Sequence, residues 1–173
     1  LGASTGLDYG LDFLPGAITY DPLVPPAPDP DLAADIVWFD AFVTNVDRTA
    51  RNANLLTWHR GLWLIDHGAA LYFHHAWSDP AERAADPFER VRDHVLLPLA
   101  GDLSAADARA RDRLRPDVFD AIVQAVPDVW MEDQYRGDPP AAVRQAYRDY
   151  FEARLAASDA FVEEAGRARA QLV

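Results

Sequence analysis

The chain contains no cysteine and no lysine. The absence of cysteine excludes disulfide bonds and thiol chemistry and favours a reducing compartment, so we expect a cytoplasmic protein. All 16 basic residues are arginine, a bias that a GC-rich genome also produces. Whatever its origin, this composition excludes a Schiff base and a lysine–phosphate contact within these 173 residues.

Long apolar runs are absent too. No stretch is long enough to cross a bilayer, so we expect no membrane partner. The first residues also lack the basic stretch and the apolar core of a signal peptide. The net charge of −12 would repel nucleic acid, which we therefore do not expect as a partner.

The composition is that of one domain with a sizeable core, since half of the residues are hydrophobic. Residues 1–30 are rich in proline and glycine and predict an irregular entry segment. Residues 31–173 predict a mainly α body. The spacing of apolar residues and the capping signals predict helices from the N-cap Asp31 to near Asn45, over Pro87–Leu97, after a capping box at Ser104, over Pro116–Val126 and over about Pro140–Arg169.

Two short apolar runs interrupt this helical pattern. Asn54–Thr57 and Leu62–Ile65 predict two strands joined by a turn at residues 59–61. Such a hairpin returns the residue after its second strand, Asp66, to the side of the loop that precedes its first strand. The predicted fold therefore brings Asp66 close to the loop around Asp47.

These two segments contain the residue types that phosphoryl transfer requires. Asp47 can orient an acceptor hydroxyl and take its proton, so we predict it as the catalytic base. Asn52, five residues further on, and Asp66 offer the oxygen ligands that Mg²⁺ prefers. We predict that both bind the metal and, through it, the nucleotide.

Two further features support the pattern. Gly68 lets the backbone turn directly after the metal-binding Asp66, and Arg48, or alternatively Arg51, can pair with a phosphate or with one of the acids. We assign Arg48 the supporting catalytic role. An Asp–Asn pair alone is common in loops, where both side chains bond their own backbone; the hairpin and the Asp-X-Gly make the pattern more specific.

Other residues near Asp66 suggest weaker alternatives. Three histidines lie close in sequence and make a zinc or iron site conceivable, although their spacing matches no known ligand pattern: His67, His74 and His75. We expect His67 to be a neighbour of the metal loop, and His74 and His75 to satisfy local hydrogen bonds. Five aromatic residues flank the hairpin, and we expect them to pack between it and the helices, with substrate contact as the alternative: Trp58, Trp63, Tyr72, Phe73 and Trp77.

The order Asp47-Arg48, Asn52, Ile65-Asp66-His67-Gly68 resembles the catalytic and metal loops of HipA-like kinases, an atypical branch of the protein kinase fold. It is also similar to that of the phosphatidylinositol kinases. The resemblance is strongest over residues 31–75 and implies a helical C-terminal lobe that uses ATP and Mg²⁺ to phosphorylate a Ser/Thr hydroxyl. It also implies the roles predicted above for Asp47, Asn52 and Asp66.

The lysine side of such an active site is missing. No glycine-rich loop follows a strand, and no lysine can contact the α- and β-phosphates. We therefore expect the N-terminal lobe to lie outside these residues. A small-molecule hydroxyl is an equally compatible acceptor. The alternatives are a non-catalytic helical module, such as a pseudokinase that binds a partner protein, and a metal-dependent hydrolase that uses Asp66 and nearby histidines.

Overall fold

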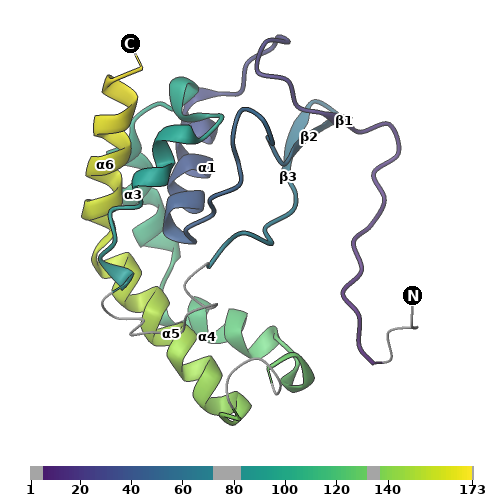
Figure 1. Ribbon diagram of the computed structural model, residues 1–173, viewed down its shortest axis with the longest axis vertical. Coiled ribbons are helices and arrows are strands. Elements are labelled where there is room, and N and C mark those ends of the chain that lie inside the picture. The colour runs from purple at the N-terminus through teal and green to yellow at the C-terminus, as the bar shows by residue number, and fades with distance from the viewer. Residues whose placement is uncertain (1–5, 72–82, 132–136, 173) are drawn as a thin grey trace.

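The computed structural model describes residues 6–71, 83–131 and 137–172, and these ranges form a mainly α protein with a small sheet (Figure 1). The described α-helices are α1 (Pro30–Phe42), α3 (Leu103–Arg113), α4 (Pro116–Ala125), α5 (Pro140–Ala156) and α6 (Ser158–Ala170). Short 3₁₀ helices are η2 (Glu89–Asp93), η3 (Leu97–Leu99) and η4 (Asp128–Trp130). The prediction of a mainly α chain is confirmed. No helix within these described ranges is both long and apolar enough to cross a membrane.

Helix α1 is the centre of the fold. Asp29, rather than the predicted Asp31, is its N-cap, and its carboxylate accepts from the amides of Asp31 and Leu32 at 2.9 and 3.2 Å. Pro30 fits the first helical position, where no amide donor is needed, so the helix begins earlier than predicted. Most of its residues are buried, because α3 and α6 pack along it (Figure 1).

The predicted hairpin is present to within one residue. Strands β2 (Leu55–Trp58) and β3 (Gly61–Leu64) pair antiparallel, and a third strand, β1 (Ile18–Thr19), pairs with β2. The entry segment 1–30 is therefore not wholly irregular, because Ile18 and Thr19 join the sheet. The order of strands is β1-β2-β3.

The predicted helix over Pro87–Leu97 is wrong. This segment forms η2 and the start of η3, and the residues 94–96 between them begin with an extended residue, His94. Phe88 has a left-handed conformation with φ of 55°, which a regular α-helix cannot contain. His94 is extended because it forms an isolated β-bridge with Thr49.

Two other helix predictions need correction. Asp102, not Ser104, caps α3, and its carboxylate accepts from the amides of Ser104 and Ala105 at 2.9 and 3.1 Å. The long predicted helix is two helices that change direction at Ala157, so that α5 packs on α4 while α6 packs on α1 and α3 (Figure 1). One straight helix could not reach both surfaces. The prediction of α4 is confirmed.

Stacked aromatic rings join these helices. Phe42 at the end of α1 stacks on Trp38 at 5.1 Å, on Phe151 at 5.9 Å and on Phe119 at 6.2 Å between ring centroids. Trp38 also meets Phe161 of α6 edge-on at 5.6 Å. Because each buried aromatic side chain removes a large apolar area from water, this cluster fixes the end of α1. The loop that contains Asp47 begins there.

Candidate functional site

The loop from Val43 to Asn54 is held from both sides. Backbone bonds join its start to α1, where Asn45 N donates to Asp40 O at 2.8 Å. Its middle is joined to the segment between η2 and η3, where Val95 N donates to Arg48 O at 3.1 Å. The loop is therefore fixed by main-chain contacts to two elements that are distant in sequence.

The loop joins Asp47 to Asn52 directly and, through Asn54, to the main chain of Asp66. One carboxylate oxygen of Asp47, Oδ2, accepts from Nδ2 of Asn52 at 2.8 Å and from Nδ2 of Asn54 at 3.3 Å. Asn54 Nδ2 also lies 3.4 Å from the main-chain oxygen of Asp66. Asn54, which the sequence analysis did not assign to the site, thus connects Asp47 to Asp66.

Asp66 has an unusual backbone conformation. Its φ is 50°, a left-handed value that is uncommon outside glycine and that costs conformational energy. Its side chain is exposed, with Oδ1 at 3.4 Å from the amide of Gly68. The Asp66 carboxylate is therefore accessible from solvent.

The structure corrects the role predicted for Arg48. Its side chain is fully buried and forms a salt bridge with Asp40, so it cannot contact a phosphate at the surface. Its guanidinium donates to the main-chain oxygen of Asn54, just before β2, and lies 3.5 Å from that of Ile65, just after β3. Arg48 therefore holds the Asp47 loop against both ends of the hairpin. Arg51 is exposed.

Asp40 on α1 is the anchor for Arg48. Its side chain has no exposed surface, and it accepts hydrogen bonds from Asn45 Nδ2 at 2.9 Å, from His94 Nε2 at 2.9 Å and from the guanidinium of Arg48. Burial on its own would raise the pKa of Asp40, but the bonds from His94 and Arg48 outweigh it and hold the pKa below its usual value. Asp40 is therefore an ionised carboxylate, and hydrogen bonds from protein groups replace those that water would donate to it.

His94 has one tautomer that satisfies its contacts. Its Nδ1 accepts from the amide of Leu96 at 3.1 Å, so Nε2 carries the proton that it donates to Asp40. His94 thus links Asp40 to the segment that packs on the Asp47 loop.

His67 contacts the same network from its solvent-exposed side. Its Nε2 lies 3.0 Å from Nη2 of Arg48, a group that can only donate, so this ring nitrogen accepts and is unprotonated. Burial, and then the charge of Arg48, lower the pKa of His67. Its ring also meets Phe39 edge-on at 5.9 Å. His67 is therefore neutral near pH 7 and helps to orient Arg48.

The residues present fit a magnesium ion that phosphates and water also coordinate. Among the described residues there is no cluster of three or more His, Cys, Asp or Glu side chains that could hold a metal. Mg²⁺ does not need one, because it is commonly bound by one or two protein oxygens together with phosphate oxygens and water. Asn52 uses its amide nitrogen on Asp47, which leaves its side-chain oxygen available as a ligand, and the Asp66 side chain is exposed.

The other residues considered near the hairpin take different positions. Trp58 and Trp63 contact each other at 5.3 Å between centroids, and Trp58 Nε1 donates to Pro15 O at 2.9 Å. Trp58 therefore contacts the entry segment, whereas we predicted that both residues pack between the hairpin and the helices, and Trp63 is 43% exposed. Five of these residues lie outside the described ranges: Tyr72, Phe73, His74, His75 and Trp77.

Sequence reasoning missed Asp40, Asn54 and His94. Asp40 had a signal, since it is the one carboxylate in the apolar second half of the helix, residues 36–42, and stands eight residues before an arginine. A buried acid of this kind requires a buried partner. His94 had no comparable signal, because only the tertiary fold brings it to Asp40.

Comparison of the chain with family models, with curated proteins and with solved structures finds no match.

Proposed function

We propose that this chain carries the catalytic and metal loops of an ATP- and Mg²⁺-dependent phosphotransferase of the HipA-like kinase type, which acts on a Ser/Thr hydroxyl. The observation that carries the proposal is the direct bonding of Asp47 to Asn52, together with the contact through Asn54 to Asp66. The contact from Asn54 to the main chain of Asp66 joins segments that are 12 residues apart in sequence.

In this proposal Asp47 is the catalytic base. It orients the acceptor hydroxyl and takes its proton while the hydroxyl oxygen bonds to the γ-phosphorus. The bond between that phosphorus and the bridging β–γ oxygen breaks, and ADP leaves. Asn52 and Asp66 would hold Mg²⁺, which supplies positive charge to the phosphate oxygens. Arg48 is a positioning residue, because it holds the loop and touches no substrate.

The lysine side of the site has to come from outside these residues. The chain has no lysine and no glycine-rich loop after a strand, so the proposal requires an N-terminal lobe elsewhere. We propose that this lobe covers the phosphates. We also propose that the complete enzyme is cytoplasmic.

Phosphate transfer tests the proposal directly. The full-length gene product that contains this chain, incubated with Mg²⁺ and γ-labelled ATP, should transfer label to itself or to a Ser/Thr-containing protein. Asp47→Asn removes the base and should lower the rate by about 10²–10⁴-fold. The exposed Asp117→Asn should leave the rate unchanged. Full activity of Asp47→Asn would overturn the assignment.

A non-catalytic module that binds a partner protein is the second candidate. It is favoured by the apolar side chains that the extended entry segment exposes, with Leu7, Tyr9, Leu11 and Phe13 between 56% and 81% exposed. The two candidates differ in one measurable property, since the module would neither bind Mg-ATP nor transfer phosphate.

A further inference from the structure

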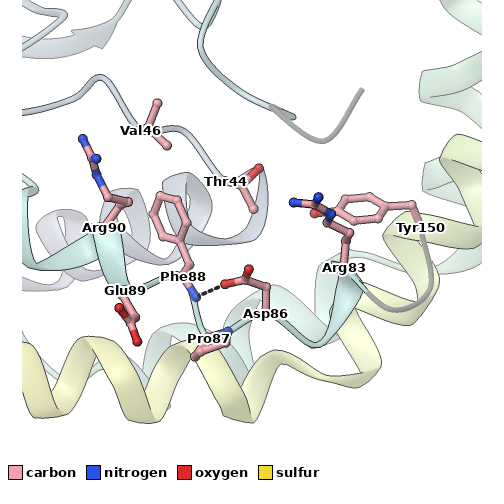
Figure 2. A pocket seen from close by; sticks show the side chains of 9 residues that line it. All are labelled: Thr44, Val46, Arg83, Asp86, Pro87, Phe88, Glu89, Arg90 and Tyr150. Carbon is pink, nitrogen blue, oxygen red and sulfur yellow. Dashed lines mark hydrogen bonds between the residues drawn. The ribbon is translucent and has the colours of Figure 1, made fainter. Parts of the chain in front are cut away.

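The pocket between the start of the Asp47 loop and residues 83–90 has side chains of both charges. Its volume is about 400 Å³, and Asp47 itself does not line it. Figure 2 shows the Asp86 carboxylate between Arg83 and Arg90. Because these charges are mixed, the pocket favours no single class of ligand. The exposed apolar residues of the entry segment are the clearer sign of a binding surface.

In residues 7–13 of the entry segment, every second residue is apolar. The sequence is Leu-Asp-Tyr-Gly-Leu-Asp-Phe, and this period of two is typical of a β-strand with one apolar face. All four apolar side chains are exposed, at 56% for Leu7, 74% for Tyr9, 73% for Leu11 and 81% for Phe13. A strand with this pattern normally packs its apolar face against another layer of protein, whereas here that face is open to solvent.

Two tryptophans hold this segment at its ends. Trp130 Nε1 donates to Leu7 O at 2.7 Å, and Trp58 Nε1 donates to Pro15 O at 2.9 Å. Figure 1 shows the chain running extended along the edge of the molecule between the N-terminus and β1. Residues 9–13 make no main-chain hydrogen bond within the described ranges. The segment therefore presents an open strand edge, and its fixed ends lower the entropic cost of pairing that edge.

Neither the chain's own sheet nor a second copy of the chain suits this strand. The near edge of the sheet is already occupied by β1, which continues the same segment. In two copies, the antiparallel register that sets all four apolar side chains against one another puts Asp8 opposite Asp12 twice, and like charges directly opposite are destabilising. Residues 7–13 are also far short of the roughly 20–30 residues per partner of stable complexes between separate chains.

We propose that residues 7–13 add as an edge strand to a sheet of the N-terminal lobe. The inference rests on the proposed function, which requires such a lobe. A partner within the same polypeptide suits so short a strand, because tethering raises its local concentration. Main-chain hydrogen bonds would supply affinity, and the alternate apolar side chains would pack on the lobe.

The polar face of the strand indicates the charge of the surface that it meets. Asp12 is exposed and makes no ion pair with any part of the chain that the structure describes. Its carboxylate, in a chain of net charge −12, favours arginine or lysine beside the sheet edge of the lobe. Because the segment continues into β1, which pairs with the hairpin, this contact connects the lobe to the element that precedes Asp66.

Hydrogen exchange of the full-length gene product, resolved to single amides, tests the inference without any nucleotide. A strand that pairs along one edge bonds only every second amide. Either residues 9, 11 and 13 or residues 10 and 12 should therefore exchange at least about tenfold more slowly than the other set. Docking of the apolar side chains without strand pairing would not produce this alternation.

Substitutions in the entry segment separate the strand from its surroundings. Leu11→Asp places a carboxylate on the apolar face and should abolish the alternating protection. Leu23→Asp, at a position 88% exposed in the same entry segment, is the matched control and should keep it. Asp12→Lys should weaken the protection, most strongly at low salt.

Three results would overturn the inference. The first is free exchange of residues 9–13 in the wild type. The second is equal protection in Leu11→Asp and Leu23→Asp. The third is protection that disappears on dilution, because it would show pairing with a second copy instead of a tethered lobe. Unchanged protection in Asp12→Lys would contradict the basic surface assigned to the lobe.

The inference and the proposed function fail in different ways. If the full-length protein transfers phosphate while residues 9–13 exchange freely, the strand pairing is wrong and the function stands. If the alternating protection is present but no phosphate is transferred, the strand pairs with its lobe and the proposed function is wrong.

Discussion

A buried ion pair determines how the Asp47 loop is placed. Arg48 and Asp40 have fully buried side chains, a costly arrangement unless every donor and acceptor is satisfied. Here Asp40 accepts from Asn45, Arg48 and His94, and Arg48 also bonds the main chain at both ends of the hairpin. The pair thus sets where Asn54 and Asp66 lie relative to Asp47.

Removing the anchor should strongly destabilise the protein. Asp40→Ala leaves Arg48 as an unpaired buried charge, and we expect the free energy of unfolding in urea to fall by about 3–5 kcal/mol. Asp117→Ala breaks an ion pair whose side chains are 65% and 70% exposed and should change it by less than about 0.5 kcal/mol. An Asp40→Ala variant as stable as Asp117→Ala would contradict the described network.

His67 should make stability depend on pH. Its pKa is lowered in the folded protein, so the folded state binds this proton more weakly than the unfolded state does. The stabilisation is present above the unfolded pKa of about 6.5 and is lost as pH falls toward the folded pKa. Between about pH 7.5 and about pH 5.5, the free energy of unfolding of the wild type should fall more steeply than that of His67→Gln.

The exposed hairpin residue His59 provides the control. His59→Asn should keep the slope of the wild type, because His59 contacts Trp58 and takes no part in the Arg48 network. Equal slopes for the wild type and His67→Gln would show that protonation of His67 is not linked to folding.

At the scale of elements, the hairpin carries the site but has an unfavourable turn. A two-residue loop connects Trp58 to Gly61, the last pair of the hairpin. Both residues of the loop, His59 and Arg60, have positive φ, 47° and 65°. This is what a type I′ turn requires, and Asn-Gly satisfies it with less strain. The turn therefore holds the strands in register without supplying much stability itself.

Replacing the turn should stabilise the protein. We expect His59→Asn combined with Arg60→Gly to raise the free energy of unfolding by about 1 kcal/mol, because strain at left-handed residues is relieved. Urea unfolding monitored by tryptophan fluorescence measures it, since Trp58 lies beside the turn. A loss of stability in the double variant would mean that the side chains of His59 and Arg60 contribute more than their backbone costs.

At the scale of the whole molecule, the sequence predicted the helices and strands whose positions follow from the local spacing of apolar residues. The 3.6-residue spacing located α1 and α4, and the alternation of two apolar runs with a turn located the hairpin, and with it the approach of Asp66 to Asp47. The break at Ala157 was not predictable, because α5 and α6 form one continuous helical pattern and only packing on α1 and α3 separates them. The extended His94 depended on a bridge to Thr49, 45 residues away.

The site shows the same division. Asp47, Asn52 and Asp66 were predicted because phosphoryl transfer needs those residue types in that order, and the structure joins Asp47 to Asn52 and, through Asn54, to the main chain of Asp66. Arg48 was expected to pair with a phosphate or with one of the acids of the site, because the sequence does not show that Arg48 is buried against Asp40. Asn54 was missed because its role is to join two segments that meet only in the folded chain.

Calorimetry of Mg-ATP binding to the full-length protein tests the central claim most directly. If Asp66 and Asn52 hold the metal, Asp66→Ala should weaken Mg²⁺-dependent ATP binding by at least about tenfold, while Asp159→Ala, at a position 81% exposed on α6, should bind as the wild type does. Unchanged Mg²⁺-dependent binding by Asp66→Ala, with the fold intact by circular dichroism, would contradict the assignment of this loop as a metal site.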